Sequence, residues 1–206
     1  DKVLRKLAAQ EAGGKPLNEE QIEDLRTNYD LIRWAERYLG WKPRESGGGD
    51  KYQAMILNCS SKRKVLRCGR RLGKSETLIV WTLYKLYTNS PKASRYDEHT
   101  KTWEKGFSTI MFVAPYLSQV KDFFSRLRDF VYNSPDLKAE ILSDVSTPFY
   151  KMELKSGMKL LGFSAGSSGA SSLRGQKADY IVLDEMDYLD QDAIDTILAL
   201  LMEHND

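Results

Sequence analysis

The chain has 206 residues, of which 41% are hydrophobic and 29% are charged. This length and composition fit one or two globular domains with a sizeable core. The formal net charge of +2 excludes recognition of nucleic acid through bulk charge, so such a partner would require a local basic patch.

Cysteine content and the terminal sequence predict the cellular setting. Cys59 and Cys68 give neither a metal-ligand spacing nor a framework of disulfides, which favours a reduced compartment. Residues 1–14 lack the apolar core of a signal peptide, and the apolar stretch 77–87 is too short to span a bilayer. We expect a soluble intracellular protein with no membrane partner.

The N-terminal part is predicted to be a helical arm. Residues 2–12 favour a short helix. Asn18, with Gln21 three residues later, predicts the start of one amphipathic helix that ends near Gly40. The sequence therefore predicts an arm over residues 1–45, a glycine-rich joint over 46–50 and a main domain over 51–206.

The main domain alternates between strand and helix patterns. The expected elements are a short helix near 52–59, a strand at 64–69, a helix at 74–88, a strand at 107–115, a helix at 117–132, a hairpin at 150–165 that turns at Ser156–Gly157, a strand at 179–185 and a helix at 190–202. Residues 94–106 are expected to form a solvated loop. This order predicts an α/β fold with a mainly parallel sheet flanked by helices.

The triplet Gly73-Lys74-Ser75 stands between the predicted strand and the predicted helix. This context aims backbone N–H groups and the positive end of a helix dipole at an anion. Lys74 could reach the β- and γ-phosphates of a nucleotide, and the Ser75 hydroxyl could bind Mg²⁺. The alternative is an ordinary strand–turn–helix with a cap.

The strand at 179–185 ends in Asp184-Glu185. Two adjacent carboxylates at the end of a buried strand are costly unless they meet a cation or hydrogen bonds. Asp184 could hold Mg²⁺ through water, and Glu185 could polarise a water for attack on the γ-phosphate. The alternative is a strand that runs out into an acidic loop.

The two motifs together predict a P-loop NTPase, with Walker A and Walker B elements, of the RecA-like class that carries an additional strand and a catalytic glutamate (ASCE). An adjacent glutamate as base favours an ATPase over the switch GTPases, which use a glutamine. No guanine-reading Asn-Lys-x-Asp sequence occurs. ATP and Mg²⁺ are the expected ligands.

These motifs resemble the ATPase domain of the large terminase subunit, the motor that packages double-stranded DNA into viral capsids. The family commonly replaces the first glycine of the phosphate loop and places an arginine four residues before the lysine. Cys68 and Arg70 occupy these positions here. The resemblance implies that Arg70 braces γ-phosphate oxygens, whereas Arg71 is expected to point outward or to pair with an acidic neighbour.

Two further segments carry the resemblance, which spans about residues 30–203. Residues 50–57 look like the adenine-reading segment of the family, in which Gln53 would read the adenine edge and Tyr52 would pack nearby. An ordinary helix start is the alternative. Residues 164–179 match the family's small-residue loop, and there Arg174 would be an arginine finger that completes the site of a neighbouring subunit. A flexible loop with a solvated arginine is the alternative.

The predicted site is therefore a set of residues from four segments. The catalytic candidates are Glu185, Lys74, Arg70 and Arg174, and the metal-binding candidates are Ser75 and Asp184. The nucleotide-binding candidates are Tyr52, Gln53, Cys68, Gly69, Arg70, Arg71, Leu72, Gly73, Lys74, Ser75, Glu76 and Thr77.

The resemblance implies ATP hydrolysis that drives double-stranded viral DNA into a procapsid, in the cytoplasm of the infected host. The implied partners are DNA, a portal protein on the procapsid, a small terminase subunit and identical subunits in a ring. The chain stops at residue 206, before the coupling strand and nuclease domain of the family, so we expect neither here. A helicase-type DNA-dependent ATPase and a nucleotide-binding docking module without turnover are the alternatives.

Overall fold

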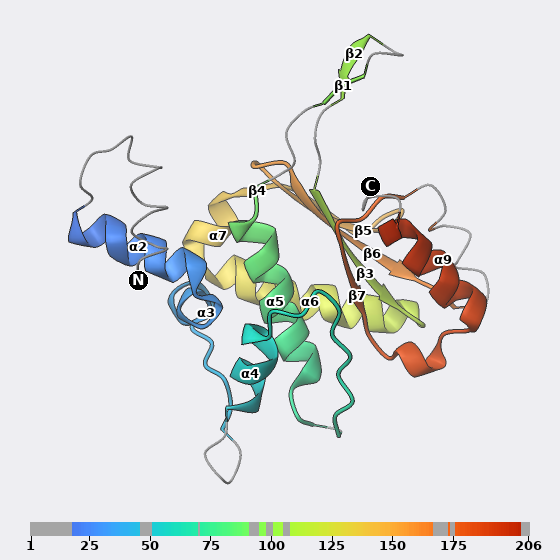
Figure 1. The fold of residues 1–206 in the computed structure, drawn as a ribbon, viewed down its shortest axis with the longest axis horizontal. Coiled ribbons are helices and arrows are strands. Elements are labelled where there is room, and N and C mark those ends of the chain that lie inside the picture. The colour runs from blue at the N-terminus through green and yellow to red at the C-terminus, as the bar shows by residue number, and fades with distance from the viewer. Residues whose placement is uncertain are drawn as a thin grey trace. The chain divides into compact units, whose positions relative to one another are not determined.

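The computed structural model describes residues 18–45, 51–69, 71–90, 95–97, 101–104, 108–166, 173 and 176–202 (Figure 1). The chain divides into two compact units, Asp1–Thr77 and Leu78–Asp206. The predicted helix at 2–12 and the predicted joint at 46–50 lie outside the described residues. The division into arm, joint and main domain stays a prediction.

The first unit contains three helices, α2 (Glu19–Tyr29), α3 (Leu31–Leu39) and α4 (Tyr52–Asn58). Asn18 and Gln21 form the predicted capping box at the start of α2. The prediction of one continuous helix up to Gly40 was wrong, because Asp30 interrupts it. The backbone of Asp30 is extended, and its carboxylate accepts hydrogen bonds from the Ile32 and Arg33 amides, which starts a second helix.

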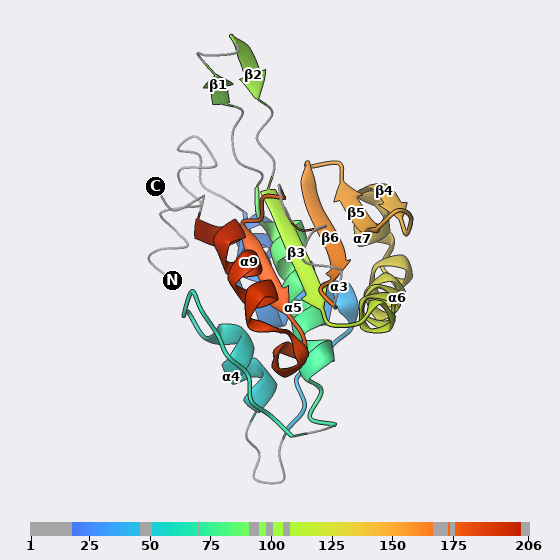
Figure 2. The same cartoon turned by 90° about the vertical axis from the view of Figure 1, so that its right-hand side faces the viewer.

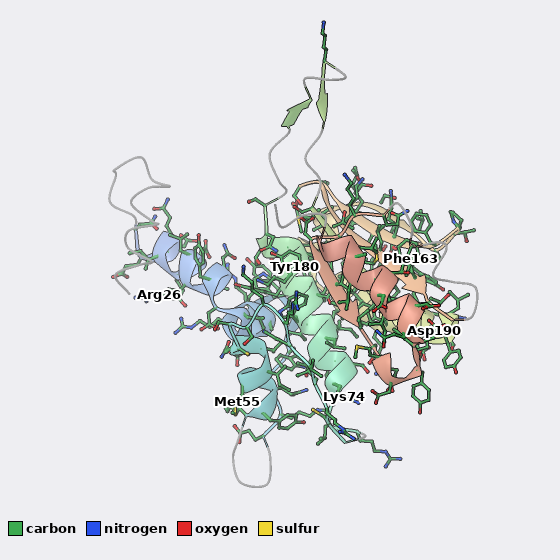
Figure 3. All side chains as sticks on the ribbon, turned by 45° about the vertical axis from the view of Figure 1, so that its right-hand side comes forward. Arg26, Met55, Lys74, Phe163, Tyr180 and Asp190 are labelled. Atoms are coloured by element: carbon green, nitrogen blue, oxygen red, sulfur yellow. The ribbon has the colours of Figure 1, made fainter. Side chains whose placement is uncertain are left out.

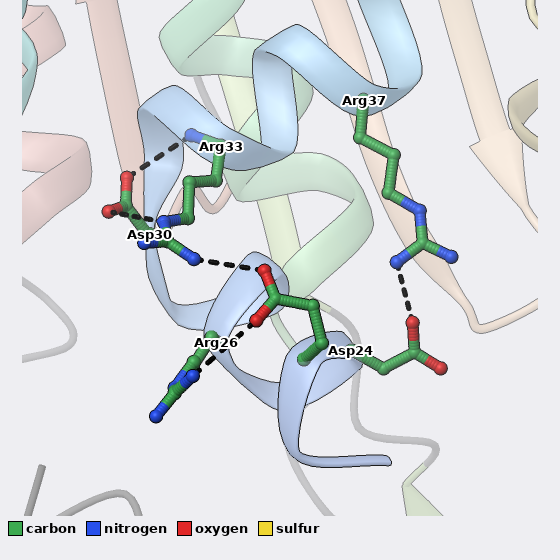
Figure 4. A network of polar contacts seen from close by, with 6 residues as sticks. Asp24, Arg26, Asp30, Arg33 and Arg37 are labelled. Atoms are coloured by element: carbon green, nitrogen blue, oxygen red, sulfur yellow. Dashed lines mark hydrogen bonds and ion pairs between the residues drawn. The ribbon is translucent and has the colours of Figure 1, made fainter. Parts of the chain in front are cut away.

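Ion pairs join α2 to α3 (Figure 4). Arg33 contacts Glu23 at 2.9 Å, and Arg37 contacts Asp24. These side chains are about half exposed, so each pair contributes about 0.2–1 kcal/mol at most. The buried side chain of Trp34 therefore matters more for the position of α3.

The prediction of a strand at residues 64–69 was wrong, because this segment has no regular secondary structure. Its only two large aliphatic residues, Val65 and Leu66, are adjacent in sequence. Adjacent side chains of an extended chain point to opposite faces, so the segment has no apolar face to bury. Val65 is accordingly 86% exposed.

The second unit is built on a five-stranded sheet with the order β4-β5-β6-β3-β7 (Figure 1). Its strands are β3 (Ser108–Ala114), β4 (Ile141–Val145), β5 (Tyr150–Leu154), β6 (Met158–Ser164) and β7 (Tyr180–Leu183). β3 pairs in parallel with β6 and β7, whereas β5 pairs antiparallel with β4 and β6. The sheet is therefore mixed rather than mainly parallel, since the predicted hairpin is extended by β4, a strand that the sequence did not reveal.

Helices cover both faces of this sheet (Figure 2). They are α5 (Lys74–Thr88), which begins in the first unit, α6 (Leu117–Asn133), the short α7 (Pro135–Ala139) and α9 (Gln191–Met202), with a 3₁₀ turn at Met186–Tyr188. Alternate residues of β3 serve the two faces. Phe112 stacks on Phe123 of α6 at 3.7 Å between ring centroids, whereas Met111 and Val113 share a buried cluster with Ile197 of α9. Strands that are buried on both faces explain the continuous apolar runs in the sequence.

A second, two-stranded sheet lies within the segment that was expected to be a loop. β1 (Arg95–Asp97) pairs antiparallel with β2 (Thr102–Glu104), and Tyr96 stands opposite Trp103 in the register. The prediction of an irregular loop was therefore wrong for these residues. Aromatic residues favour strands, and the polar residues around them concealed that signal in the sequence.

Gly162 of β6 packs directly against α6. A Cβ atom at this position would lie 2.4 Å from Phe124 Cε2 and 2.9 Å from Val120 Cγ1. We expect Gly162→Ala to lower the free energy of unfolding by about 1–3 kcal/mol, because both neighbours are buried and cannot move aside. Denaturant unfolding measures this change. Gly69→Ala is the control, since its nearest contact would be an ordinary 3.7 Å, and an equal loss in the two variants would contradict the packing assigned to Gly162.

In the part of the chain that the structure describes, no helix has both the length and the apolar character needed to cross a membrane.

Candidate functional site

The phosphate-loop candidate forms the start of α5 in the first unit, where Lys74 is the first helical residue (Figure 3). Gly73 has a φ of +72°, in the left-handed region. The first helical hydrogen bond runs from the Thr77 amide to the Gly73 carbonyl at 2.9 Å. The amides of Lys74, Ser75 and Glu76 precede that bond, so the helix offers them no carbonyl acceptor. This is the arrangement that an anion can complete.

Gly73 is required by its surroundings as well as by its φ. A Cβ atom on this residue would lie 2.6 Å from Gln53 Nε2. The loop therefore depends on glycine at this position for two independent reasons, the backbone conformation and the close approach of a buried amide.

Residues of α4 support the loop from within the same unit. Gln53 is fully buried, and its Nε2 donates to Thr77 Oγ1 at 3.0 Å and to the Gly73 carbonyl at 3.3 Å. The Tyr52 hydroxyl donates to the Leu72 carbonyl at 2.9 Å. From the sequence, these two residues are expected to contact the adenine base, and that role stays a prediction. The structure adds that both contact the backbone of the loop.

The loop residues before Gly73 differ in their exposure to solvent. Arg71 is exposed, as expected, and has a φ of 63°, which is uncommon for a residue with a side chain. Cys68 is half-buried and Gly69 is exposed. Arg70, the proposed brace for the γ-phosphate, lies outside the described residues. Its role stays a prediction.

Sequence reasoning missed Arg44. Its Nη2 atom donates to Glu76 Oε2 at 2.9 Å, and its Cζ atom lies 3.7 Å from the position that a Cβ on Gly73 would take. A guanidinium thus lies beside the loop, from a residue 32 positions before its partner. Its positive charge was the only sequence feature that could have marked it as a site residue, and other basic residues of the chain carry the same charge.

The carboxylate pair lies in the second unit, directly after β7. The Asp184 amide donates to the Val113 carbonyl of β3 at 3.0 Å, which continues the parallel pairing one residue beyond the strand. Asp184 Oδ1 accepts the Glu185 amide at 3.1 Å. Asp184 is half-buried, whereas Glu185 is exposed. The carboxyl ends of parallel strands are where α/β proteins commonly bind their ligands.

Glu185 has left-handed backbone angles, with φ 52° and ψ 44°. A residue with a side chain pays about 1–3 kcal/mol for such a conformation. The chain turns here from β7 into the 3₁₀ turn Met186–Tyr188. The observation supports a function for Glu185, since strained residues concentrate at functional sites.

The remaining candidates are placed only in part. Arg174 lies outside the described residues, while its neighbour Leu173 is fully buried in the cluster between the sheet and α9. No group of three or more His, Cys, Asp and Glu side chains suited to a metal ion occurs among the residues that the structure describes.

The two metal-binding candidates carry oxygen donors, the type of ligand that Mg²⁺ prefers. Ser75 has a hydroxyl in the first unit, and Asp184 has a carboxylate in the second. Their joint use by one metal ion stays a prediction.

Neither a family model nor a curated protein matches this sequence. Solved structures do match the fold. The large terminase ATPase domain of Thermus phage P74-26 aligns over 82% of this chain with a TM-score of 0.61 and 19% identity. The chain shares the fold of phage large terminase ATPase domains.

A second terminase extends this finding. The large terminase of bacteriophage HK97 aligns over 86% of the chain with a TM-score of 0.64 and 17% identity. A mutant of the Thermus phage terminase domain gives a TM-score of 0.57 over 81% of the chain. The chain spans 64% of the Thermus phage terminase domain and 36% of the HK97 terminase. The expected terminase fold is thus confirmed, over less than two thirds of the length of either terminase.

Proposed function

We propose that this chain is a Mg²⁺-dependent ATPase of the RecA-like ASCE class that acts in packaging double-stranded viral DNA. The observation that carries the proposal is the Gly73-Lys74-Ser75 turn at the start of α5, where Gly73 has a left-handed backbone and a Cβ atom would lie 2.6 Å from Gln53 Nε2. The likeness of the fold to large terminases supports the part of the proposal that concerns DNA packaging. Its DNA, procapsid, small-subunit and ring partners, and its place in the host cytoplasm, rest on that likeness.

The proposed chemistry assigns one task to each residue. The first-turn amides and the Lys74 ammonium bind the β- and γ-phosphates of ATP. Ser75 and Asp184 hold Mg²⁺, which when bound neutralises negative charge on the phosphate oxygens. Glu185 accepts the proton of the attacking water, which is the work of a general base.

Two arginines complete the proposal. Arg70 stabilises negative charge on the γ-phosphate oxygens from the same chain, as a guanidinium can through paired hydrogen bonds. Arg174 does so from a neighbouring copy. An arginine supplied from a second molecule raises phosphoryl-transfer rates by about 10³–10⁵ in known cases. Isolated copies are therefore expected to turn over ATP slowly.

The test is ATP hydrolysis measured against protein concentration. We expect the rate per molecule to rise steeply with concentration, and Arg174→Ala to remove that rise. Mixing Arg174→Ala with Glu185→Gln should restore part of the activity, because each variant supplies what the other lacks. ATP binding without phosphate release at any concentration would support a docking module instead, and strand displacement on duplex DNA would support a helicase-type enzyme.

A further inference from the structure

The side-chain amide of Gln53 has committed all of its hydrogen-bonding groups inside the first unit. Its Oε1 accepts the backbone N–H of Arg44 at 2.7 Å, and its Nε2 donates to Thr77 Oγ1 and to the Gly73 carbonyl. A glutamine amide has two N–H donors, so both have acceptors here. The residue is also fully buried.

The Gly73 carbonyl is the centre of this network. It accepts the Thr77 amide at 2.9 Å, the Thr77 hydroxyl at 3.0 Å and the Gln53 amide at 3.3 Å. The carbonyl of Gly73 and the N–H of Lys74 belong to one planar, trans peptide unit, so they point in opposite directions. Whatever holds the carbonyl inward therefore aims the Lys74 N–H away from Gln53 and Thr77.

The geometry points to Gln53 as a positioning residue for the phosphate loop. It fixes the Gly73–Lys74 peptide plane, and with it the Lys74 amide that faces the phosphates. The inference rests on the proposed nucleotide site. It assigns the effect of Gln53 to the triphosphate, which every nucleotide shares, rather than to the base.

Arg44 belongs to the same hydrogen-bond network. The Arg44 amide holds Gln53 Oε1, and the Arg44 side chain pairs with Glu76 in the first turn of α5. Residue 44 thus contacts both Gln53 and the helix start. This arrangement fixes the rotamer of the buried amide, since its oxygen and its nitrogen have opposite partners.

The test compares ligands with and without a base. Calorimetry would measure binding of MgATP, MgGTP and magnesium tripolyphosphate to the chain and to Gln53→Ala. We expect the variant to lose about tenfold in affinity for all three ligands, because the Gly73 carbonyl and the Thr77 hydroxyl lose a partner. A loss confined to ATP, with tripolyphosphate unaffected, would overturn the inference and identify Gln53 as a reader of adenine.

Three further variants keep the test independent of folding. Gln53→Glu keeps the shape of the side chain and the oxygen that accepts from the Arg44 amide, but it removes both N–H donors. Thr77→Val removes the hydroxyl of a residue that is not a candidate for contact with the nucleotide base. Both should weaken all three ligands alike, and unchanged affinity in both would overturn the inference. Met55→Gln, on the exposed side of α4, is the matched control and should bind as the unaltered chain does. If the unaltered chain binds none of the three ligands, the proposed function itself fails, and the inference with it.

Discussion

Glu185→Gln is expected to lower the rate of ATP hydrolysis about 1000-fold while leaving MgATP affinity nearly unchanged, because a general base supplies about 10²–10⁴ of the rate. The glutamine has nearly the same shape but cannot accept the proton of the attacking water. Glutamate and glutamine share the same carbon skeleton up to Cδ, so the left-handed backbone of residue 185 disfavours both to a similar extent. Phosphate release at saturating ATP, at a protein concentration where the unaltered chain is active, measures the effect.

The matched control is Asp187→Asn. Asp187 is an exposed acid in the 3₁₀ turn that follows Glu185, and the same loss of one negative charge there should leave hydrolysis within about twofold of the unaltered rate. Equal losses in the two variants would show that only the local charge matters. Undiminished hydrolysis by Glu185→Gln would show that the base has been assigned to the wrong residue.

Lys74→Ala is expected to weaken MgATP binding about 100-fold, since removing one partner of a close charge pair costs about 2–5 kcal/mol. The first-turn amides remain, so some affinity for the triphosphate should persist. Alanine is a good helix former, so α5 should still begin at this residue. Calorimetric titration with MgATP gives the affinity directly.

Lys42→Ala provides the comparison, because it removes one exposed ammonium from the same unit and the same net charge from the chain. It should bind MgATP as the unaltered chain does. If both variants bound equally well, Lys74 would have no part in holding the phosphates, and the Gly73-Lys74-Ser75 turn would be an ordinary helix start.

Helices with strong periodicity were predictable from the sequence, and their ends were predictable where capping residues mark them. Asn18 and Gln21 form the expected capping box, and Gly40 ends α3 in the left-handed conformation. Asp30 was missed because its side chain caps a helix from inside an uninterrupted apolar pattern. Local patterns describe which face is apolar, not where a side chain turns back on the backbone.

The errors in the strands have a tertiary origin. In β4, the Asp144 carboxylate accepts hydrogen bonds from Nε and Nη2 of Arg128 in α6. A polar residue in a short segment weakens the sequence pattern that predicts a strand. Its ion-pair partner lies on another element, so the local sequence does not show that the residue is satisfied there. The prediction of a strand at 64–69 was wrong for a different reason. The segment has too few apolar side chains on either face to offset the cost of burying its backbone.

The candidate site was predictable to the extent that its residues lie in short motifs. Gly73, Lys74 and Ser75 do, and the structure gives Gly73 the backbone that the motif requires. The contact of Gln53 with Gly73 and Thr77 was not predictable, because it joins residues 20 and 24 positions apart. The ion pair of Arg44 with Glu76 is equally long-range and was missed for the same reason.

The most direct measurement is a crystal structure of the chain with Mg²⁺ and a non-hydrolysable ATP analogue. We expect one bound triphosphate with Lys74 Nζ on its β- and γ-oxygens, the Ser75 hydroxyl on the metal at about 2.1 Å and Asp184 on the same metal through water. An analogue that contacts Lys74 while Asp184 and Glu185 lie far from its metal would contradict the account.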